Sequence, residues 1–108
     1  MMKDDARQWL NEQFGGDEET IAAVWGEYLA SSSEKIGEAL AALAAFDFPL
    51  LDRIAHTLKG NALMVGDQVS AAAAIALRDA AKASDPTAAE KAIAALKALD
   101  GENRAETT

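Results

Sequence analysis

Apolar residues recur every three or four positions along most of the chain, and charged or polar residues fill the positions between them. This spacing matches the 3.6 residues per turn of an α-helix, and no stretch alternates in the way of a half-buried strand. The longest apolar stripe predicts one helix over about residues 17–46; its members are Ile21, Val24, Trp25, Tyr28, Leu29, Ile36, Leu40 and Leu43. The pattern therefore predicts an all-α protein.

Residues that begin or end helices separate the apolar stripes. An aspartate able to cap a helix stands before each of the four longer stripes, at positions 17, 47, 67 and 85, with Phe48 as the alternative to Asp47. Prolines at 49 and 86 suit a first helical turn. These signals predict further helices over about 48–65, 67–83 and 86–100. Gly15-Gly16 ends a shorter amphipathic segment that begins near Ala6, which we expect to form a lid that buries Trp9.

The predicted loops are only two to four residues long. Short loops place consecutive helices side by side in opposite directions. We therefore expect an antiparallel up-down four-helix bundle with a short N-terminal cap helix, formed by one domain over residues 1–101. The last residues, 102–108, offer no apolar anchor, and we expect them to form a disordered tail.

The chain of 108 residues carries a formal net charge of −8 and contains no cysteine. This acidity argues against binding to nucleic acid or to anionic membrane surfaces, which attract basic proteins. Without cysteine there is no disulfide framework and no thiolate metal site. No apolar run approaches the roughly 20 residues that span a bilayer, and the N-terminal residues do not resemble a signal peptide. We expect a monomeric cytoplasmic protein that binds no membrane.

The only histidine, His56, lies on the polar side of the helix predicted over 48–65. Lys59 and Gly60 follow it by three and four residues, which makes them its neighbours on the helix surface. The apolar residues on the opposite side are Leu51, Ile54, Leu58 and Val65. His56 is therefore predicted to point away from the core.

Gly60 is an unusual residue for a helix interior, where glycine costs about 1 kcal/mol relative to alanine. It could end the helix as its C-cap, or it could leave room for the backbone of another protein beside His56. The apolar spacing continues past Gly60 to Val65, and Gly66 is the better helix stop. We favour the interpretation that Gly60 leaves room for a partner.

Most reactions that use histidine need further groups that the sequence does not supply. Metal binding needs three or four ligands, and Asp52, one turn before His56, is the only candidate helper. No nucleophile elbow suggests a hydrolase, and no glycine-rich phosphate loop or kinase signature suggests ATP binding. The remaining role is a histidine that attacks phosphorus, with Lys59 able to stabilise the negative charge of an attached phosphoryl group.

The segment Ala55-His56-Thr57-Leu58-Lys59-Gly60, followed by Gly66, resembles the histidine-containing phosphotransfer (HPt) domain family. The hallmark of that family is H-x-x-K-G with another glycine ten residues after the histidine, and the similarity extends over most of the chain. The resemblance implies that His56 accepts a phosphoryl group from a receiver-domain aspartate and passes it to another receiver. It also implies that Lys59 assists the transfer and that Gly60 leaves room for docking.

The resemblance further implies the partners and the cofactor arrangement. The expected partners are response-regulator receiver domains and a hybrid histidine kinase; the receiver supplies Mg²⁺, and the chain has no cofactor and no ATP-dependent kinase activity of its own. In relatives, polar side chains from the next helix approach the phosphoryl group, and the matching positions in this chain are Arg78 and Lys82. These two residues either support the phosphoryl group or simply face solvent. Asn61 stands where the family commonly has serine or alanine, and its amide needs hydrogen-bond partners.

A partner-binding patch is expected beside the histidine. Arg53 flanks it, and Leu63 lies two turns beyond it on the same predicted face, next to Met64. Leu63 and Met64 form either the apolar centre of a receiver-docking surface or a contact with the N-terminal helix or another neighbouring helix. Two other functions remain open: a non-phosphorylated adaptor that binds a receiver or kinase through this face, and a purely structural bundle.

Overall fold

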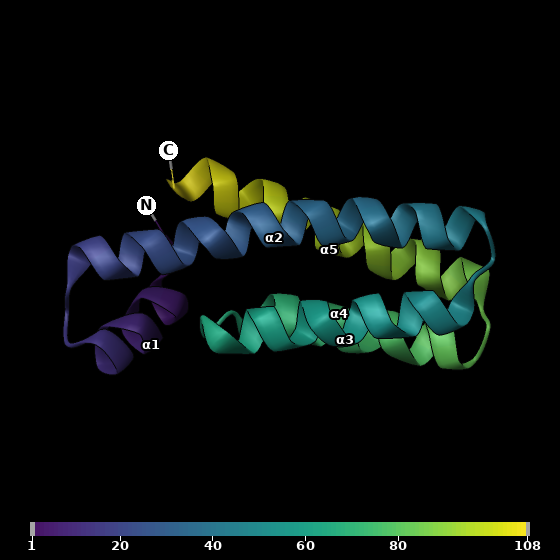
Figure 1. Ribbon diagram of the computed structural model, residues 1–108, viewed down its shortest axis with the longest axis horizontal. Helices are drawn as coiled ribbons and strands as arrows, with labels where there is room; N and C mark the ends of the chain where they lie inside the picture. The colour runs from purple at the N-terminus through teal and green to yellow at the C-terminus, as the bar shows by residue number, and fades with distance from the viewer. Residues whose placement is uncertain (1, 108) are drawn as a thin grey trace.

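The computed structural model describes residues 2–107, and these residues form helices connected by short loops, without a β-strand. The helices are α1 (Asp4–Phe14), α2 (Glu18–Ala44), α3 (Phe48–Met64), α4 (Gln68–Lys82) and α5 (Pro86–Thr107) (Figure 1). The predicted all-α class is confirmed for this part of the chain. The four predicted helix starts agree with the structure to within about one residue.

The chain reverses direction at each loop between α2 and α5, so that these helices lie side by side (Figure 1). The long helix α2 packs against α3 and α5, and α4 packs against the same two helices from the other side. The short helix α1 contacts α2 and lies at the end of the molecule where α3 turns into α4. Both described ends of the chain are at this same end (Figure 1).

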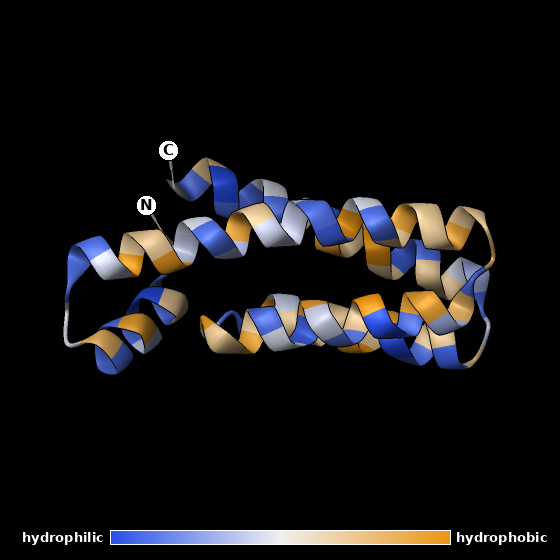
Figure 2. Ribbon diagram, in the orientation of Figure 1, coloured by the Kyte–Doolittle hydropathy of each residue, from blue (hydrophilic) through white to orange (hydrophobic). Residues whose placement is uncertain are grey.

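Hydrophobic and hydrophilic residues alternate around each helix (Figure 2), and the hydrophobic side of each helix faces the interior. Alanines at the contacts let neighbouring helices approach closely, and larger residues fill the remaining space. The main core contains Ile36, Leu51, Ile54, Leu58, Leu77, Ile93 and Leu96 together with buried alanines. The sequence pattern places Leu40 in the apolar stripe of α2, but 45% of this residue is exposed.

Aspartate side chains cap the N-termini of the four longer helices, as the sequence predicts. Each carboxylate accepts a hydrogen bond from the backbone N–H three residues later, which satisfies a group that the helix itself leaves unpaired. The bonds run from Thr20 N to Asp17, from Leu50 N to Asp47, from Ser70 N to Asp67 and from Ala88 N to Asp85.

The N-terminal helix does not bury Trp9, which remains 39% exposed; its buried residues are Ala6 and Leu10. The indole Nε1 of Trp9 donates a hydrogen bond to the carbonyl oxygen of Met64 at 3.2 Å. The turn at Gly66, which lies against the ring of Trp9, needs glycine for two reasons. Gly66 has a φ of +71°, and a Cβ there would lie 2.4 Å from the Cβ of Trp9.

The sequence predicts a disordered tail over residues 102–108, but α5 continues through residues 102–107. Asn103 is 2% exposed, and its Nδ2 donates to Asp67 Oδ2 at 3.1 Å. Arg104 donates to the backbone carbonyl oxygen of Leu29. The sequence offers no apolar anchor here because the anchors are polar. The proposed domain boundary after residue 101 therefore cuts through a helix, and residue 108 lies outside the described residues.

Candidate functional site

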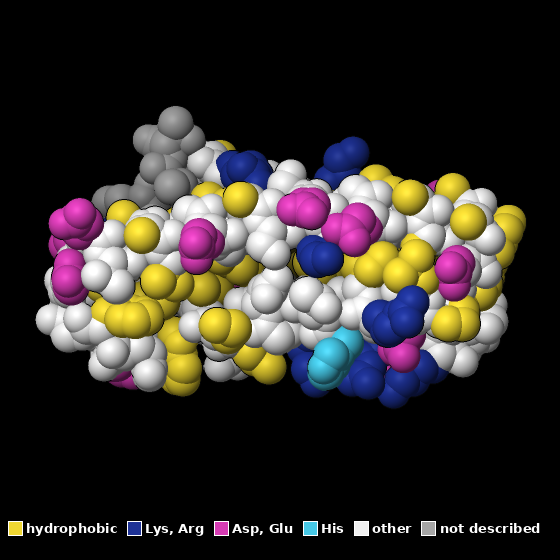
Figure 3. Space-filling view, viewed as in Figure 1, with side chains coloured by type: hydrophobic (Ala, Val, Ile, Leu, Met, Phe, Trp, Pro, Cys, Tyr) yellow, Lys and Arg dark blue, Asp and Glu magenta, His cyan; other side chains and the backbone are white. Residues whose placement is uncertain are grey.

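His56 lies in the middle of α3 with its side chain exposed, while Ile54, Ala55 and Leu58 are buried on the other side of the helix. In Figure 3 the histidine stands out at the lower edge of the molecule. Among residues 2–107, no hydrogen bond or ion pair joins the imidazole to another side chain. The exposed imidazole is therefore not held by another side chain of the described residues.

Gly60 lies inside α3, which continues to Met64, so it does not end the helix. A Cβ built at Gly60 would meet no atom within 4 Å. The packing of this chain therefore does not require a glycine at this position. The missing side chain leaves open space one turn after His56; that a partner uses this space stays a prediction.

Three of the residues predicted to act with His56 are basic, one on α3 and two on the neighbouring helix α4. Lys59 is half-buried and Lys82 is exposed, and no ion pair of either is found in the described part of the chain. Arg78 is held differently, because its Nε donates to Asp52 Oδ1 at 3.1 Å. The structure thus brings Arg78 to the turn that precedes His56, and it leaves Lys82 further along α4, in the last turn of that helix.

The charge of this face differs from that of the rest of the molecule. Together α3 and α4 carry four basic and two acidic residues, whereas α2 alone carries five acidic residues and one basic residue. In the view of Figure 3, much of the Lys and Arg surface gathers around the histidine. An anionic group is therefore attracted to the His56 face of an otherwise acidic protein.

The family model described as Hpt domain matches residues 23–102, most of the chain. The chain belongs to the Hpt domain family. Hpt domains carry out histidine phosphotransfer in two-component signalling, and they generally partner with response regulators and kinases. Searches of curated proteins and of solved structures each gave no match. No helix in the described part of this Hpt domain is long and apolar enough to cross a membrane.

The predicted docking residues of the Hpt domain lie on the surface. Arg53 is exposed, and Leu63 and Met64 are 46% and 73% exposed. Trp9 of α1 donates a hydrogen bond to the backbone carbonyl oxygen of Met64, while the side chains of Leu63 and Met64 are exposed. Both residues therefore lie on the surface, next to the point where α1 contacts the end of α3.

Asn61, where this Hpt domain departs from the common family pattern, is satisfied within the chain. Its Nδ2 donates to Ser31 Oγ on α2 at 2.9 Å. The hydrogen bond ties α3 to α2 five residues after His56. The departure therefore affects the packing of the two helices and leaves the exposed face of α3 unchanged.

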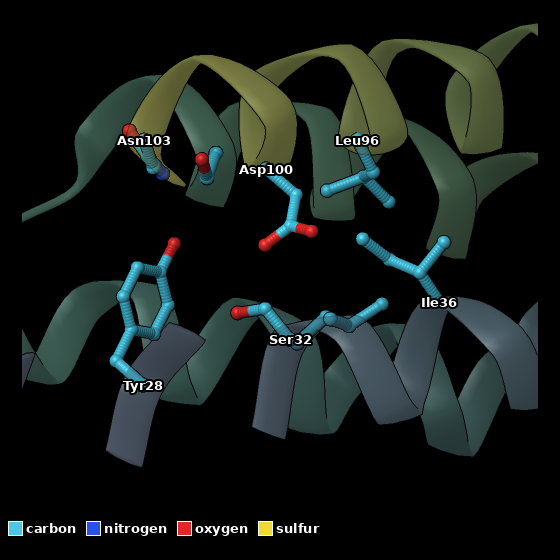
Figure 4. A pocket seen from close by; sticks show the side chains of 8 residues that line it. Tyr28, Ser32, Ile36, Leu96, Asp100 and Asn103 are labelled. Carbon is cyan, nitrogen blue, oxygen red and sulfur yellow. The ribbon is translucent and has the colours of Figure 1, made fainter. Parts of the chain in front are cut away.

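Sequence reasoning missed a buried polar cluster around Asp67, which it treated only as a helix cap. The side chain of Asp67 is fully buried and accepts hydrogen bonds from Lys3 Nζ at 2.8 Å, Tyr28 Oη at 2.6 Å and Asn103 Nδ2 at 3.1 Å. Figure 4 shows Tyr28 and Ser32 of α2 facing Asn103 and Asp100 of α5 across a small internal pocket. No local pattern could reveal the cluster, because its members are far apart in the sequence.

The surroundings of Asp67 and Tyr28 shift both pKa values. Burial alone would raise the pKa of Asp67, but hydrogen bonds from Lys3, Tyr28 and Ser70 outweigh it and hold the pKa below its ordinary value. Burial, together with the hydrogen bond to Asp67, raises the pKa of Tyr28 well above its ordinary value. The cluster therefore contains a carboxylate and a neutral phenol over a wide pH range.

Proposed function

We propose that this Hpt domain is a phosphorelay intermediate that accepts a phosphoryl group on His56 from the aspartate of a receiver domain and passes it to another receiver. The observation that supports this proposal most directly is the exposed imidazole without an internal partner, on the basic face of an acidic protein. Helices α2–α5, taken as an antiparallel up-down four-helix bundle with α1 as its cap, would provide the rigid scaffold.

The transfer needs only one nucleophile from this chain. The lone pair of a ring nitrogen of His56 forms a bond to phosphorus while the bond from phosphorus to the donor aspartate breaks, and the electron pair leaves with the carboxylate oxygen. Onward transfer reverses these events: an aspartate oxygen of the acceptor forms a bond to phosphorus and the N–P electron pair returns to the ring. The Mg²⁺ that assists both steps would be held by the receiver.

The other candidate residues have distinct proposed roles. Lys59 would stabilise the charge of the phosphoryl group, and Arg78 and Lys82 would support it from α4. Gly60 would admit the receiver backbone to His56. Partner binding would use Arg53 and an apolar patch formed by Leu63 and Met64, whose exposure suits the buried centre of an interface.

The test is phosphoryl transfer from a panel of receiver domains that have been phosphorylated with radiolabelled acetyl phosphate. We expect the full chain to take up acid-labile label and the variant His56→Gln to take up none. Absence of label on the unmodified chain with every receiver would overturn the proposal, as would labelling of His56→Gln.

The exposure of Leu63 and Met64 favours one second candidate, a non-phosphorylated adaptor that binds a receiver or kinase through the same face. An adaptor would bind equally well with or without His56. The affinity of the same panel of receiver domains would be measured for the unmodified chain, for His56→Gln and for Leu63→Asp. Binding that is lost only in Leu63→Asp, together with no transfer of phosphate to the unmodified chain, would favour the adaptor.

A further inference from the structure

Asp52 places a negative charge beside the residue that the proposed function phosphorylates. It precedes His56 by four residues on α3, so the two side chains lie on the same face of the helix, one turn apart. A phosphoryl group on His56 brings further negative charge to that face. Unless it is neutralised, the carboxylate of Asp52 opposes the arrival of that group.

Arg78 of α4 supplies the neutralising charge. Its Nε–H donates to Asp52 Oδ1 at 3.1 Å, and the two side chains are 31% and 32% exposed. An ion pair this exposed contributes little to the stability of a fold. The pair therefore matters less for holding α3 against α4 than for fixing the place of one guanidinium group.

The direction of the side chains brings Arg78 toward His56. Long side chains on a helix extend over the turn on the N-terminal side of their own residue. Because α3 and α4 run in opposite directions, Arg78 extends toward the later residues of α3, while His56 extends back toward the turn of Asp52. By this rule, both side chains are directed toward the surface between Asp52 and His56.

The hydrogen bond to Asp52 uses only the Nε of Arg78. No partner of its terminal nitrogens is found among the described residues, so their N–H groups are free to bind an anion. A guanidinium has a planar fork of donors that fits the oxygens of a phosphoryl group. Held by Asp52 at one edge, Arg78 can present its other edge to phosphorus-bound oxygen.

We propose that Asp52 is a positioning residue for phosphotransfer, which holds Arg78 across the boundary of α3 and α4 so that the guanidinium faces the phosphoryl group on His56. The proposal rests on His56 as the phosphoacceptor. It assigns to Asp52 an effect that depends on its partner: favourable to phosphorylation when Arg78 is present, and unfavourable when Arg78 is absent.

A double-mutant cycle tests this dependence with phosphoramidate, a small donor that needs no receiver domain. The ring nitrogen of His56 bonds to phosphorus while the P–N bond of the donor breaks, and the amide nitrogen leaves as ammonia with a proton. The rates of His56 phosphorylation are compared in the unmodified chain, Asp52→Ala, Arg78→Ala and the double variant. Asp52→Asn provides a second variant of the same shape as aspartate, and thermal unfolding confirms that each variant is folded.

With Arg78 present, we expect Asp52→Ala to slow phosphorylation roughly two- to fivefold, the range of an exposed ion pair. In the Arg78→Ala background, the same substitution should accelerate the reaction, because it removes a carboxylate that nothing neutralises. Asp52→Glu should restore much of the rate, since it can still accept from Arg78. The control Asp79→Ala removes an exposed carboxylate from α4 that has no ion pair in the described chain, and it should not slow the reaction.

Two results would overturn the role of Asp52. Acceleration by Asp52→Ala in both backgrounds would make Asp52 a simple source of repulsion. No change in either background would leave the pair without influence on the reaction. Neither result affects the proposed relay, which fails separately if receivers transfer no phosphoryl group to a chain that phosphoramidate phosphorylates at His56.

Discussion

At the scale of single residues, the proposed phosphoacceptor His56 would need little from its own chain. The imidazole has no internal partner among residues 2–107, and the basic residues proposed to stabilise phosphate belong to two helices, α3 and α4. Among the described residues, no group of three or more His, Cys, Asp or Glu side chains that could hold a metal ion is found. If His56 is the phosphoacceptor, the proposed relay would take its selectivity from the surface that a receiver covers.

Lys59→Ala should slow the acceptance of phosphate by His56 roughly three- to tenfold, because it removes a cation one helical turn from the attached group. The thermal unfolding temperature should change little, since the ammonium makes no ion pair in the described structure. Rates of label uptake from a phosphorylated receiver provide the measurement. Lys91→Ala on α5 is the matched control, and an equal rate for both variants would contradict the role of Lys59.

Gly60→Ala should affect stability and transfer in opposite directions. The added methyl group has open space, so the free energy of unfolding should rise by about 0.5–1 kcal/mol, as alanine replaces glycine in a helix. Transfer from a receiver should slow, because the methyl group occupies the room for the partner backbone, whereas phosphorylation by phosphoramidate should not.

Denaturant unfolding and the two transfer assays separate these effects. Gly37→Ala, in α2 with equally open space, is the control that should gain stability without a loss of transfer. If Gly60→Ala transferred as fast as Gly37→Ala, the proposed access role of Gly60 would be wrong.

At the scale of helices, local signals predicted most of the fold. Aspartate caps mark the helix starts, and apolar spacing fixes the rotation of α3, since burying Leu51 and Leu58 leaves His56 no direction but outward. The pairing of Asp52 with Arg78 could not be predicted in this way, because it depends on how α3 and α4 are rotated against each other. Local patterns describe each helix but not its neighbour's orientation.

The helix ends contain two residues whose backbone conformation suits glycine better. Ser84, after α4, has a φ of +50°, and Phe46, after α2, has a φ of +52°. Non-glycine residues adopt this left-handed conformation at a cost. Phe46 also has a ring contact with Phe48, so Ser84 is the clearer place to measure that cost.

Ser84→Gly should raise the free energy of unfolding by up to about 1 kcal/mol, because glycine adopts a positive φ without strain. Ser84→Ala, which keeps the strain, should not stabilise the protein. Chemical denaturation of the two variants and the unmodified chain gives the comparison. A Ser84→Gly protein no more stable than Ser84→Ala would show that the turn stores no measurable strain.

At the scale of the whole molecule, the Asp67 cluster joins segments that are distant in sequence. Asp67 bonds Lys3, Tyr28 and Asn103, which lie before α1, in α2 and in α5. The last of these segments has no apolar anchor, and for that reason its sequence predicts disorder. Asn103 is held by a hydrogen bond to Asp67, which is distant in sequence, so a local pattern does not predict this contact.

Removal of residues 102–108 should lower the free energy of unfolding by about 1–3 kcal/mol, the cost of leaving buried polar groups without partners. The deletion takes away Asn103 and Arg104, which bond Asp67 and the carbonyl oxygen of Leu29. A shorter deletion of residues 106–108 keeps both and is the control. Equal stability of the two truncated chains would contradict an anchoring role for this end of α5.

The stability of the protein should depend on pH through the same cluster. The pKa of Tyr28 is raised in the folded state, so its stabilising effect is complete below the ordinary tyrosine pKa of about 10 and is lost above it. The pKa of Asp67 is lowered, so its contribution is present above the ordinary aspartate pKa of about 4 and is lost as the pH falls further.

Tyr28→Phe tests the alkaline side, because Tyr28 is the only tyrosine of the chain. The variant should be less stable at neutral pH, having lost the hydrogen bond to Asp67, but its stability should fall less steeply above pH 10. Denaturant unfolding between pH 7 and about 11 gives both slopes. Parallel slopes would show that the phenol does not titrate differently in the folded and unfolded states.

The two tryptophans occupy opposite environments: Trp25 is 2% exposed and packs against the ring of Tyr28, whereas Trp9 is 39% exposed and bonds Met64 beside the uncovered Leu63. The molecule thus contains its own fluorophores for two separate events. Emission from Trp9 would respond when another protein covers its neighbourhood, and emission from Trp25 would respond when the interior opens. Complex formation and unfolding could then be followed by spectroscopy without attaching a dye.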